Sequence, residues 1–335
     1  MSDTKNIYYM QELGNDSEID LDIYITTLNC NEDRTWRAME MLGSCALHHC
    51  QIIILDFQNQ NELMEMNKRI QECLLPDENF HFVPQEKTHR DILPKTIADI
   101  INNQSDPESL CVGIDITSIP TPHFFIVLKM LNEYGIKPYL YYTEPAEYLL
   151  KGTLFNSYQS FEGTISTGEV PGFPGVTSTH GEQQRVLICV LGFDRNVLPS
   201  VIDAIAPDKI VAVNGFPSYQ PKFKDISIMN NNRIFDGVYS KKLEEGESEE
   251  RTDSWLYYVD AENPYDAYSL MEKLQQHFNQ QNYNIDVVPL GTKPVALGIC
   301  EYALKHDNIR ILFPFPKNNK TISQNARKTW VYRFS

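Results

Sequence analysis

The sequence predicts an α/β fold of two tandem units, each built on a mainly parallel β-sheet, with the units related by pseudo-twofold symmetry. Short apolar segments of strand character alternate with helical segments along the chain, as in parallel sheets that carry helices on both faces. The same order of strands and helices occurs twice, which indicates a divergent repeat. A length of 335 residues suits two domains of ordinary size.

The first half begins with a predicted strand, helix and strand, continues through a longer helical region, and ends in a strand-turn-helix element and a last strand. These segments cover residues 21–28, 34–42, 51–57, 61–75 with 92–102, 113–131 and 137–144. The second half repeats this order over residues 185–192, 196–205, 209–213, 264–280, 286–298 and 308–315. We therefore expect two Rossmann-like units with right-handed crossovers.

The predicted units span residues 1–150 and 185–335, and the second includes a short C-terminal tail. Residues 151–184 are rich in Gly, Ser, Thr and Pro, which is typical of a linker. An ordered loop over a site is the other interpretation of this segment. In the tail, alternation over residues 327–333 predicts an edge strand.

The charge of the chain limits its partners. A formal charge of −16 disfavours broad binding to nucleic acids or to membranes, because such binding relies on Lys and Arg. The seven cysteines are scattered without a CxxC pair, which indicates reduced thiols. We find no leader segment and no apolar run of about 20 residues. These features predict a cytoplasmic protein that binds a small anion in a local positive pocket.

The candidate site lies at the carboxyl ends of the strands, where open parallel sheets bind ligands. The turn at residues 291–293 begins an apolar helix, so that backbone N–H groups, the helix dipole and a lysine attract an anion. The candidate ligand-binding residues at all these strand ends are Thr26, Thr27, Asn29, Thr117, Ser118, Glu144, Asp194, Arg195, Asn214, Gly291, Thr292 and Lys293. Thr, Ser, Asp and Asn at such positions also serve as ordinary helix caps, which is the competing interpretation.

No catalytic residue is assigned from the sequence. A G-x-G-x-x-G after the first strand of either half and a G-x-x-x-x-G-K-[ST] motif are both missing, which disfavours dinucleotide oxidoreductases and NTPases, and we expect no cofactor. His48, His49 and Cys50 are adjacent, and adjacent helical residues diverge by about 100°, so no metal site is predicted. Glu144 and Glu147 suit the charged start of a helix better than acid–base catalysis.

The turn at residues 291–293 supports a family resemblance. Together with Pro294, and with Ala296 and Gly298 in the following helix, it resembles the signature of the CRISPR-associated Rossmann-fold (CARF) domains. Residues 114–120 are similar to a second variant of that element. The first half has no lysine at its matching turn, which is a departure from the family pattern.

The resemblance to CARF domains, and to the related SAVED domains built from two such units, implies a sensor of a cyclic oligonucleotide or similar nucleotide signal. The residues carried over as ligand contacts are Thr292 with Lys293 and Thr117 with Ser118. A duplicated chain would form within itself the paired site that simpler members make by dimerising. Family members usually carry an effector module, which we do not find here. The resemblance therefore implies a separate effector protein or self-association, in bacterial antiviral defence.

The sequence is also compatible with two other functions, and it does not decide whether the protein is an enzyme. The first is a metal-independent phosphodiesterase that cleaves its cyclic nucleotide, as some members of the resembled family do. That reaction needs an aligned 2′-hydroxyl and a cation, for which Lys293, Thr292 and Ser118 are the candidates. The second is a protein-interaction subunit of a defence complex with a vestigial pocket.

Overall fold

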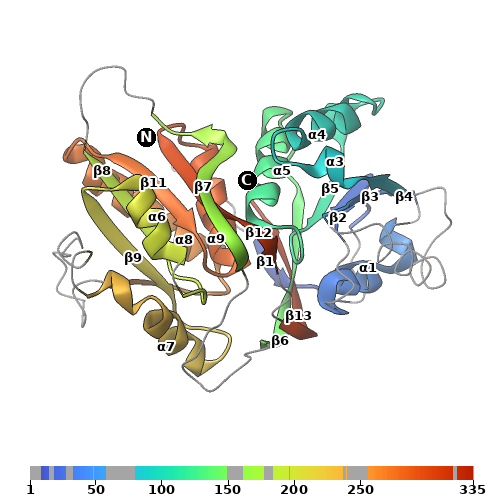
Figure 1. Ribbon diagram of the computed structural model, residues 1–335. Helices are drawn as coiled ribbons and strands as arrows, with labels where there is room; N and C mark the ends of the chain where they lie inside the picture. Colours follow the sequence, from blue (N-terminus) through green and yellow to red (C-terminus); the bar gives the residue numbers. More distant parts are fainter. Residues whose placement is uncertain are drawn as a thin grey trace, which may run out of the picture. The chain divides into compact units, whose positions relative to one another are not determined.

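The computed structural model describes residues 9–14, 19–27, 33–47, 49–57, 80–148, 161–176, 184–195, 197–236, 239, 256–319 and 323–334. The chain divides into two compact units (Figure 1). Unit 1 comprises Met1–Leu149 with Thr321–Ser335, and unit 2 comprises Leu150–Lys320. Each unit has its own sheet of mainly parallel strands flanked by helices. The predicted α/β class with two Rossmann-like units is therefore confirmed.

Unit 1 has a sheet in the order β1-β13-β6-β5-β2-β3-β4. Its strands are β1 (Tyr9–Glu12), β2 (Ile23–Thr26), β3 (Gln51–Leu55), β4 (Phe80–Val83), β5 (Val112–Asp115), β6 (Tyr139–Tyr148) and β13 (Ser323–Arg333). Its helical elements are η1 (Asp33–Trp36), α1 (Arg37–Leu47), α3 (Gln85–Thr88), α4 (Leu93–Asn102), η3 (Pro107–Ser109) and α5 (Thr121–Glu133). β13 pairs antiparallel with β1 and β6, and the other pairs are parallel.

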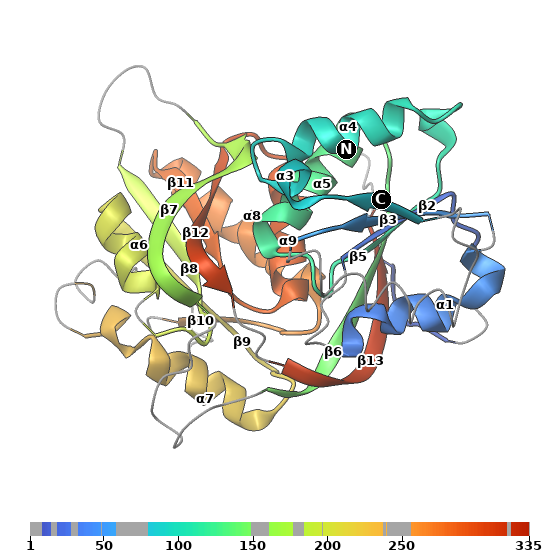
Figure 2. The ribbon, with the colours of Figure 1, turned by 45° about the vertical axis from the view of Figure 1, so that its right-hand side comes forward.

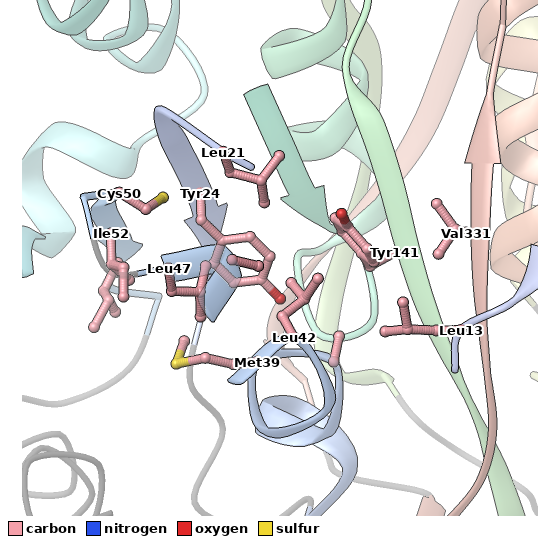
Figure 3. Packing of buried hydrophobic residues seen from close by; sticks show 13 residues of the cluster. Leu13, Leu21, Tyr24, Met39, Leu42, Leu47, Cys50, Ile52, Tyr141 and Val331 are labelled. Atoms are coloured by element: carbon pink, nitrogen blue, oxygen red, sulfur yellow. The ribbon is translucent and has the colours of Figure 1, made fainter. Parts of the chain in front are cut away.

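One hydrophobic core of unit 1 joins residues that are distant in the sequence (Figure 3). Tyr24 of β2 and Tyr141 of β6 are fully buried, and their ring centroids lie 5.8 Å apart. Met39 and Leu42 of α1 pack against them, and Val331 of β13 belongs to the same cluster. Burying such a side chain contributes roughly 1.5–3 kcal/mol, so the C-terminal strand stabilises the first unit of the chain.

Unit 2 has a sheet in the order β10-β9-β8-β11-β12-β7. Its strands are β7 (Phe161–Pro174), β8 (Arg185–Val190), β9 (Lys209–Gly215), β10 (Leu256–Val259), β11 (Asn284–Pro289) and β12 (Ile309–Asn319). Its helical elements are α6 (Val197–Ile205), α7 (Pro221–Asn230), η4 (Asn232–Ile234), α8 (Pro264–Gln280) and α9 (Lys293–Leu304). β7 pairs antiparallel with β12, and the other pairs are parallel.

The order of the parallel strands is the same in both units. It runs β4-β3-β2-β5-β6 in unit 1 and β10-β9-β8-β11-β12 in unit 2. In unit 2 the chain moves outward from β8 through β9 to β10 and then returns to the other side of β8 as β11. Figure 2 shows α6 on one face of this sheet and α8 and α9 on the other. The order of strands therefore switches between β8 and β11, which is where open α/β sheets bind ligands.

Two segments differ from the sequence-based expectations, and a third is not tested. Residues Phe161–Pro174, inside the predicted linker, form β7, because they pair with β12 through positions such as Ser166 opposite Phe315. The predicted edge strand of the tail is β13, which lies between β1 and β6 and is not an edge. The predicted helix at residues 61–75 lies outside the described residues.

The buried carboxylate of Asp286 ties β11 to its neighbouring strands near their amino ends. The Asp286 side chain is 1% exposed. The Arg310 guanidinium donates to its two carboxylate oxygens at 2.8 and 2.6 Å, and Arg185 donates at 3.3 Å. A buried carboxylate needs such partners, since desolvation would otherwise cost several kcal/mol. The ion cluster thereby joins β8, β11 and β12 at the edge opposite to the strand ends that carry the candidate site.

None of the described helices combines the length and the hydropathy needed to span a bilayer.

Candidate functional site

The site of unit 2 is built around a close approach of two loops at the strand switch. Gly192 follows β8, and a Cβ atom there would lie 2.6 Å from the carbonyl oxygen of Leu290, which follows β11. A Cβ atom on Gly291 would lie 2.6 Å from the Cγ1 atom of Val190. Atoms at these separations would clash, so Gly192 lets the two backbones meet and Gly291 leaves room for the Val190 side chain. The carboxyl ends of β8 and β11 are therefore closely packed at the switch.

The turn at residues 291–293 begins α9 as predicted. Thr292 is the N-cap, and its side-chain oxygen accepts a hydrogen bond from the N–H of Val295 at 3.5 Å. Pro294 has no N–H to offer. The expected row of backbone donors for an anion is therefore reduced, because the cap uses one donor and proline removes another. The charge of Lys293 and the helix dipole remain as the attraction for an anion.

The helix that follows is a core element. Every residue of α9 from Pro294 to Ala303 is buried, whereas Gly291, Thr292 and Lys293 are partly exposed. A Cβ atom on Gly298 would lie 1.9 Å from the Pro264 carbonyl oxygen, which shows how closely α8 and α9 pack. The turn is thus the exposed end of a rigidly packed helix.

The carbonyl oxygen of Ala261 joins the loops that follow β9, β10 and β11. It accepts a hydrogen bond from the Thr292 hydroxyl at 2.6 Å and another from the Tyr219 hydroxyl at 3.3 Å. The N–H of Ala261 donates to the carbonyl oxygen of Pro217 at 3.0 Å. These bonds hold the three loops together as one surface at the strand ends of unit 2.

The loop after β8 is held by the end of α7. The amide nitrogen of Asn231 donates to the carbonyl oxygen of Gly192 at 2.8 Å, and that of Asn230 donates to the carbonyl oxygen of Phe193 at 2.6 Å. The candidate residue Asn214 has a comparable role, since its amide nitrogen donates to the Lys224 carbonyl oxygen at 3.1 Å. Asn214 is 2% exposed, so it positions α7 instead of facing solvent.

In unit 1 the matching strand end is a buried polar network. Asp115, the last residue of β5, is 1% exposed and accepts from the N–H of Thr117 at 2.9 Å and from the Tyr24 hydroxyl at 3.3 Å. Burial raises the pKa of Asp115 to about 6, although the bonds from Thr117 and Tyr24 and the Arg34 charge act to lower it. The carboxyl group at this strand end therefore titrates close to neutral pH.

Thr117 joins this network to the neighbouring strands. Its hydroxyl oxygen accepts from the N–H of Thr143 at 2.9 Å, and the Thr143 hydroxyl lies 2.9 Å from that of Thr329. The guanidinium of the buried Arg34 donates to the Thr143 carbonyl oxygen at 2.6 Å. Thr117 does not cap α5, whose N-cap is Pro120. Its hydroxyl holds β5 and β6 together.

The position of Glu144 differs from the helix start expected from the sequence. The expected charged helix start at this position is wrong, because Glu144 lies inside β6 and is fully buried. Its carboxylate accepts a hydrogen bond from the indole N–H of Trp330 and lies 3.6 Å from the Arg327 guanidinium. Both partners come from β13, which the local sequence does not reveal. Glu144 thus stabilises the pairing of β6 with β13.

The candidate residues therefore fall into two groups. Thr26, Thr27, Thr117, Glu144 and Asn214 are buried. Residues at or near the surface of their unit are Ser118, Asp194, Arg195, Gly291, Thr292 and Lys293. Asn29 lies outside the described residues. The surface group is richer in unit 2 and includes the cations Arg195 and Lys293.

An aromatic group at the strand ends of unit 2 was not anticipated from the sequence. Phe216 directly follows β9 and is 49% exposed, and Tyr258 lies in β10. The Lys224 ammonium lies 5.0 Å from the ring centroid of Phe216 and 5.1 Å from that of Tyr258. Phe216 lies three residues after the predicted strand at residues 209–213 and carries no polar group, so the expectation of polar ligand contacts at strand ends does not include it.

No side-chain cluster for a metal is found in the part of the chain that the structure describes. A group of three or more His, Cys, Asp or Glu side chains with suitable geometry does not occur among these residues.

Comparison with known proteins finds a similar fold but no matching family. No family model matches the chain, and no curated protein matches it. A type III CRISPR defence DNA nuclease activated by cyclic oligoadenylate is similar in structure, with a TM-score of 0.52 and 8% identity over 87% of this chain. The match covers 65% of the nuclease chain, so this chain spans less than two thirds of it. At this identity the likeness shows a shared fold.

Two further solved structures from Pseudomonas aeruginosa match much more weakly. A candidate universal stress protein of strain UCBPP-PA14 has a TM-score of 0.25 and 10% identity over 88% of this chain and 94% of its own. A functionally unknown protein of strain PAO1 has a TM-score of 0.24 and 8% identity over 88% of this chain and 93% of its own. These scores are too low to support an argument.

Proposed function

We propose that this protein senses a nucleotide signal of the cyclic oligonucleotide type and acts with a separate effector protein in bacterial antiviral defence. The observation that carries the proposal is the turn Gly291-Thr292-Lys293, partly exposed at the start of α9 and next to the strand switch between β8 and β11. Ligands of open α/β sheets bind at this place.

The chemistry of the turn favours a phosphate-bearing ligand. The start of α9 carries the positive end of the helix dipole, and Lys293 adds a full positive charge at the same point. Arg195 lies in the loop after β8, on the other side of the strand switch. A chain with a formal charge of −16 repels polyanions in general, so cations at single strand ends favour a small anionic ligand.

The structural neighbour indicates which nucleotide to test first. That nuclease is activated by cyclic oligoadenylate, and its fold is similar over 87% of this chain. We propose cyclic oligoadenylate as the leading ligand class. We further propose that binding at the turn is passed on to an effector protein.

Cleavage of the bound nucleotide is the alternative activity. Lys293 would stabilise the charge that develops on the phosphate. The Thr292 hydroxyl, however, already donates to the Ala261 carbonyl oxygen at 2.6 Å, which leaves it poorly placed as a proton donor to a leaving group. No feature of the described residues favours cleavage over binding, and the analysis of products decides between them.

A thermal-shift screen with product chromatography tests the proposal. The purified chain is mixed with cyclic di-, tri- and tetra-adenylate, with other cyclic dinucleotides and with mononucleotides. A ligand at about 100 times its dissociation constant stabilises the folded state by about 2.7 kcal/mol. A shift with intact ligand supports a sensor, and a shift with linear products supports a phosphodiesterase. If no nucleotide shifts the midpoint, the sensor proposal fails and the interaction subunit is the better interpretation.

A further inference from the structure

Phe216 is an unusual residue to find uncovered at a strand end. Its side chain is 49% exposed, although the residue before it, Gly215, ends the buried strand β9. Its backbone is fixed, because its N–H donates to the Val259 carbonyl oxygen of β10 at 2.6 Å. An exposed aromatic ring on a fixed backbone gives a flat apolar surface that loses little conformational entropy when it binds a planar group.

Two neighbours hold this ring in place. The Tyr258 ring packs edge-on against Phe216, with centroids 5.9 Å apart and an interplanar angle of 69°. The Lys224 ammonium lies within 5.1 Å of both ring centroids. Lys224 is itself positioned by its carbonyl oxygen, which accepts the amide hydrogen of Asn214 at 3.1 Å. We call Phe216, Tyr258 and Lys224 the aromatic platform.

The aromatic platform is linked to the Lys293 turn through the Ala261 segment. Ala261 lies two residues after β10, and its carbonyl oxygen accepts a hydrogen bond from the Thr292 hydroxyl, with 2.6 Å between the two oxygens. The N–H of Ala261 donates to the carbonyl oxygen of Pro217, the residue after Phe216, at 3.0 Å. The two candidate contact points therefore belong to one hydrogen-bonded surface of unit 2. Their relative position is fixed within the unit.

We propose that the aromatic platform stacks against a base of the nucleotide whose phosphate lies at Lys293. This inference rests on the proposed function and adds how a base is held. Phe216 provides the stacking face, Tyr258 supports the ring, and Lys224 adds a cation beside it. Base–aromatic stacking tolerates different bases because each base has a π-face, so the platform contributes affinity and the rest of the site selects the base.

The spacing of the strands agrees with this assignment. β11 carries the Lys293 turn, β9 carries Phe216, and β8 lies between them in the sheet. Neighbouring strands lie about 4.8 Å apart, so the two strand ends are separated by roughly 10 Å along the sheet edge. An oligonucleotide covers this distance from a phosphate to a base. The ligand would thus cross the end of β8, where Gly192 and Leu290 lie in close contact.

Titration calorimetry with cyclic tetra-adenylate tests the platform. Phe216→Ala should weaken binding roughly 5- to 150-fold, the range expected from losing one base stack. Phe216→Tyr retains the ring and should bind like the wild type. Met229→Ala is the matched control, since Met229 is a large apolar residue of α7 with a similar exposure of 44%. Circular dichroism melting of each variant checks that unit 2 remains folded.

A fluorescence measurement provides a second readout. Phe216→Trp places an indole at the platform, and stacking of a base should quench its emission when cyclic tetra-adenylate is added. Ribose 5-phosphate, which has no base, should leave the emission unchanged. Quenching by the nucleotide alone supports the platform, whereas equal responses to both compounds contradict it.

The outcomes separate the platform from the proposed function. If Lys293→Ala abolishes binding while Phe216→Ala binds as tightly as Met229→Ala, the sensor proposal stands and the platform is overturned. If the wild-type chain binds none of the cyclic or mononucleotides, both proposals fall together.

Discussion

The hydroxyl of Thr292 donates a hydrogen bond to the carbonyl oxygen of Ala261 at 2.6 Å. The same side chain caps α9 by accepting from the Val295 N–H. One residue therefore fixes both the start of the helix that carries Lys293 and the loop that follows β10. The Tyr219 hydroxyl donates to the same carbonyl oxygen. Hydrogen bonds within unit 2 therefore hold the surface that we assign to ligand binding in the absence of a ligand.

Replacing Thr292 should therefore lower stability as well as ligand affinity. Thr292→Val removes the cap and the bond to Ala261 at nearly constant volume, and we expect a loss of about 1–2 kcal/mol in the free energy of unfolding. Thr292→Ser keeps the hydroxyl and should remain close to the wild type. Urea unfolding of the three proteins measures the difference. Equal midpoints for Thr292→Val and the wild type would show that the cap contributes nothing.

The contact between α8 and α9 should be sensitive to a single methyl group. In Gly298→Ala the new Cβ atom would lie 1.9 Å from the Pro264 carbonyl oxygen and 3.0 Å from the Ala267 Cβ atom, so α8 must move away. We expect a loss of about 1–3 kcal/mol, as for other overpacked cores. Gly14→Ala is the control, because nothing lies within 4 Å of its added Cβ atom. Thermal unfolding that does not distinguish the two variants would contradict this packing.

Asp115 should make stability depend on pH. Its pKa is raised by burial from 3.8 to about 6, so between these values the folded state binds more protons than the unfolded state. Below about pH 4 the Asp115 carboxyl is protonated in both states and does not lower the free energy of unfolding. That free energy decreases as the pH rises from about 4 to about 6. The loss at neutral pH is on the order of 3 kcal/mol.

Asp115→Asn removes this titration and retains an acceptor for the Thr117 N–H. Urea unfolding of both proteins near pH 4 and near pH 7.5 measures the effect. We expect the variant to gain stability relative to the wild type as the pH rises, because only the wild type must bury a charge. A difference that stays constant with pH would mean that Asp115 does not titrate in this range.

Segments with strong local periodicity were predicted well from the sequence. The turn at residues 291–293 follows a run of apolar residues and precedes Pro294, and these local signals are enough to place the end of β11 and the start of α9. α8 likewise has the predicted range of residues 264–280, because its apolar spacing is helical and Asn263 caps it.

The errors arose where pairing with distant residues decides the structure. Residues 161–174 are rich in glycine and form a strand because β12 lies beside them. Glu144 is followed by proline and looked like a helix start, yet the Trp330 indole and the Arg327 guanidinium of β13 make a buried strand position favourable for its carboxylate. Phe216 lies beyond the predicted strand at residues 209–213, and its exposure and its contact with Lys224 exist only in the folded unit.

The most direct test of the account is the affinity of Lys293→Ala for cyclic tetra-adenylate, measured by titration calorimetry beside the wild type and Lys273→Ala. Lys273 is an exposed lysine of α8 and serves as the charge-matched control. We predict that Lys293→Ala loses measurable binding while its free energy of unfolding changes by less than about 0.5 kcal/mol, and that Lys273→Ala binds like the wild type. Wild-type binding that Lys293→Ala retains in full would contradict the assignment of the turn as the phosphate contact.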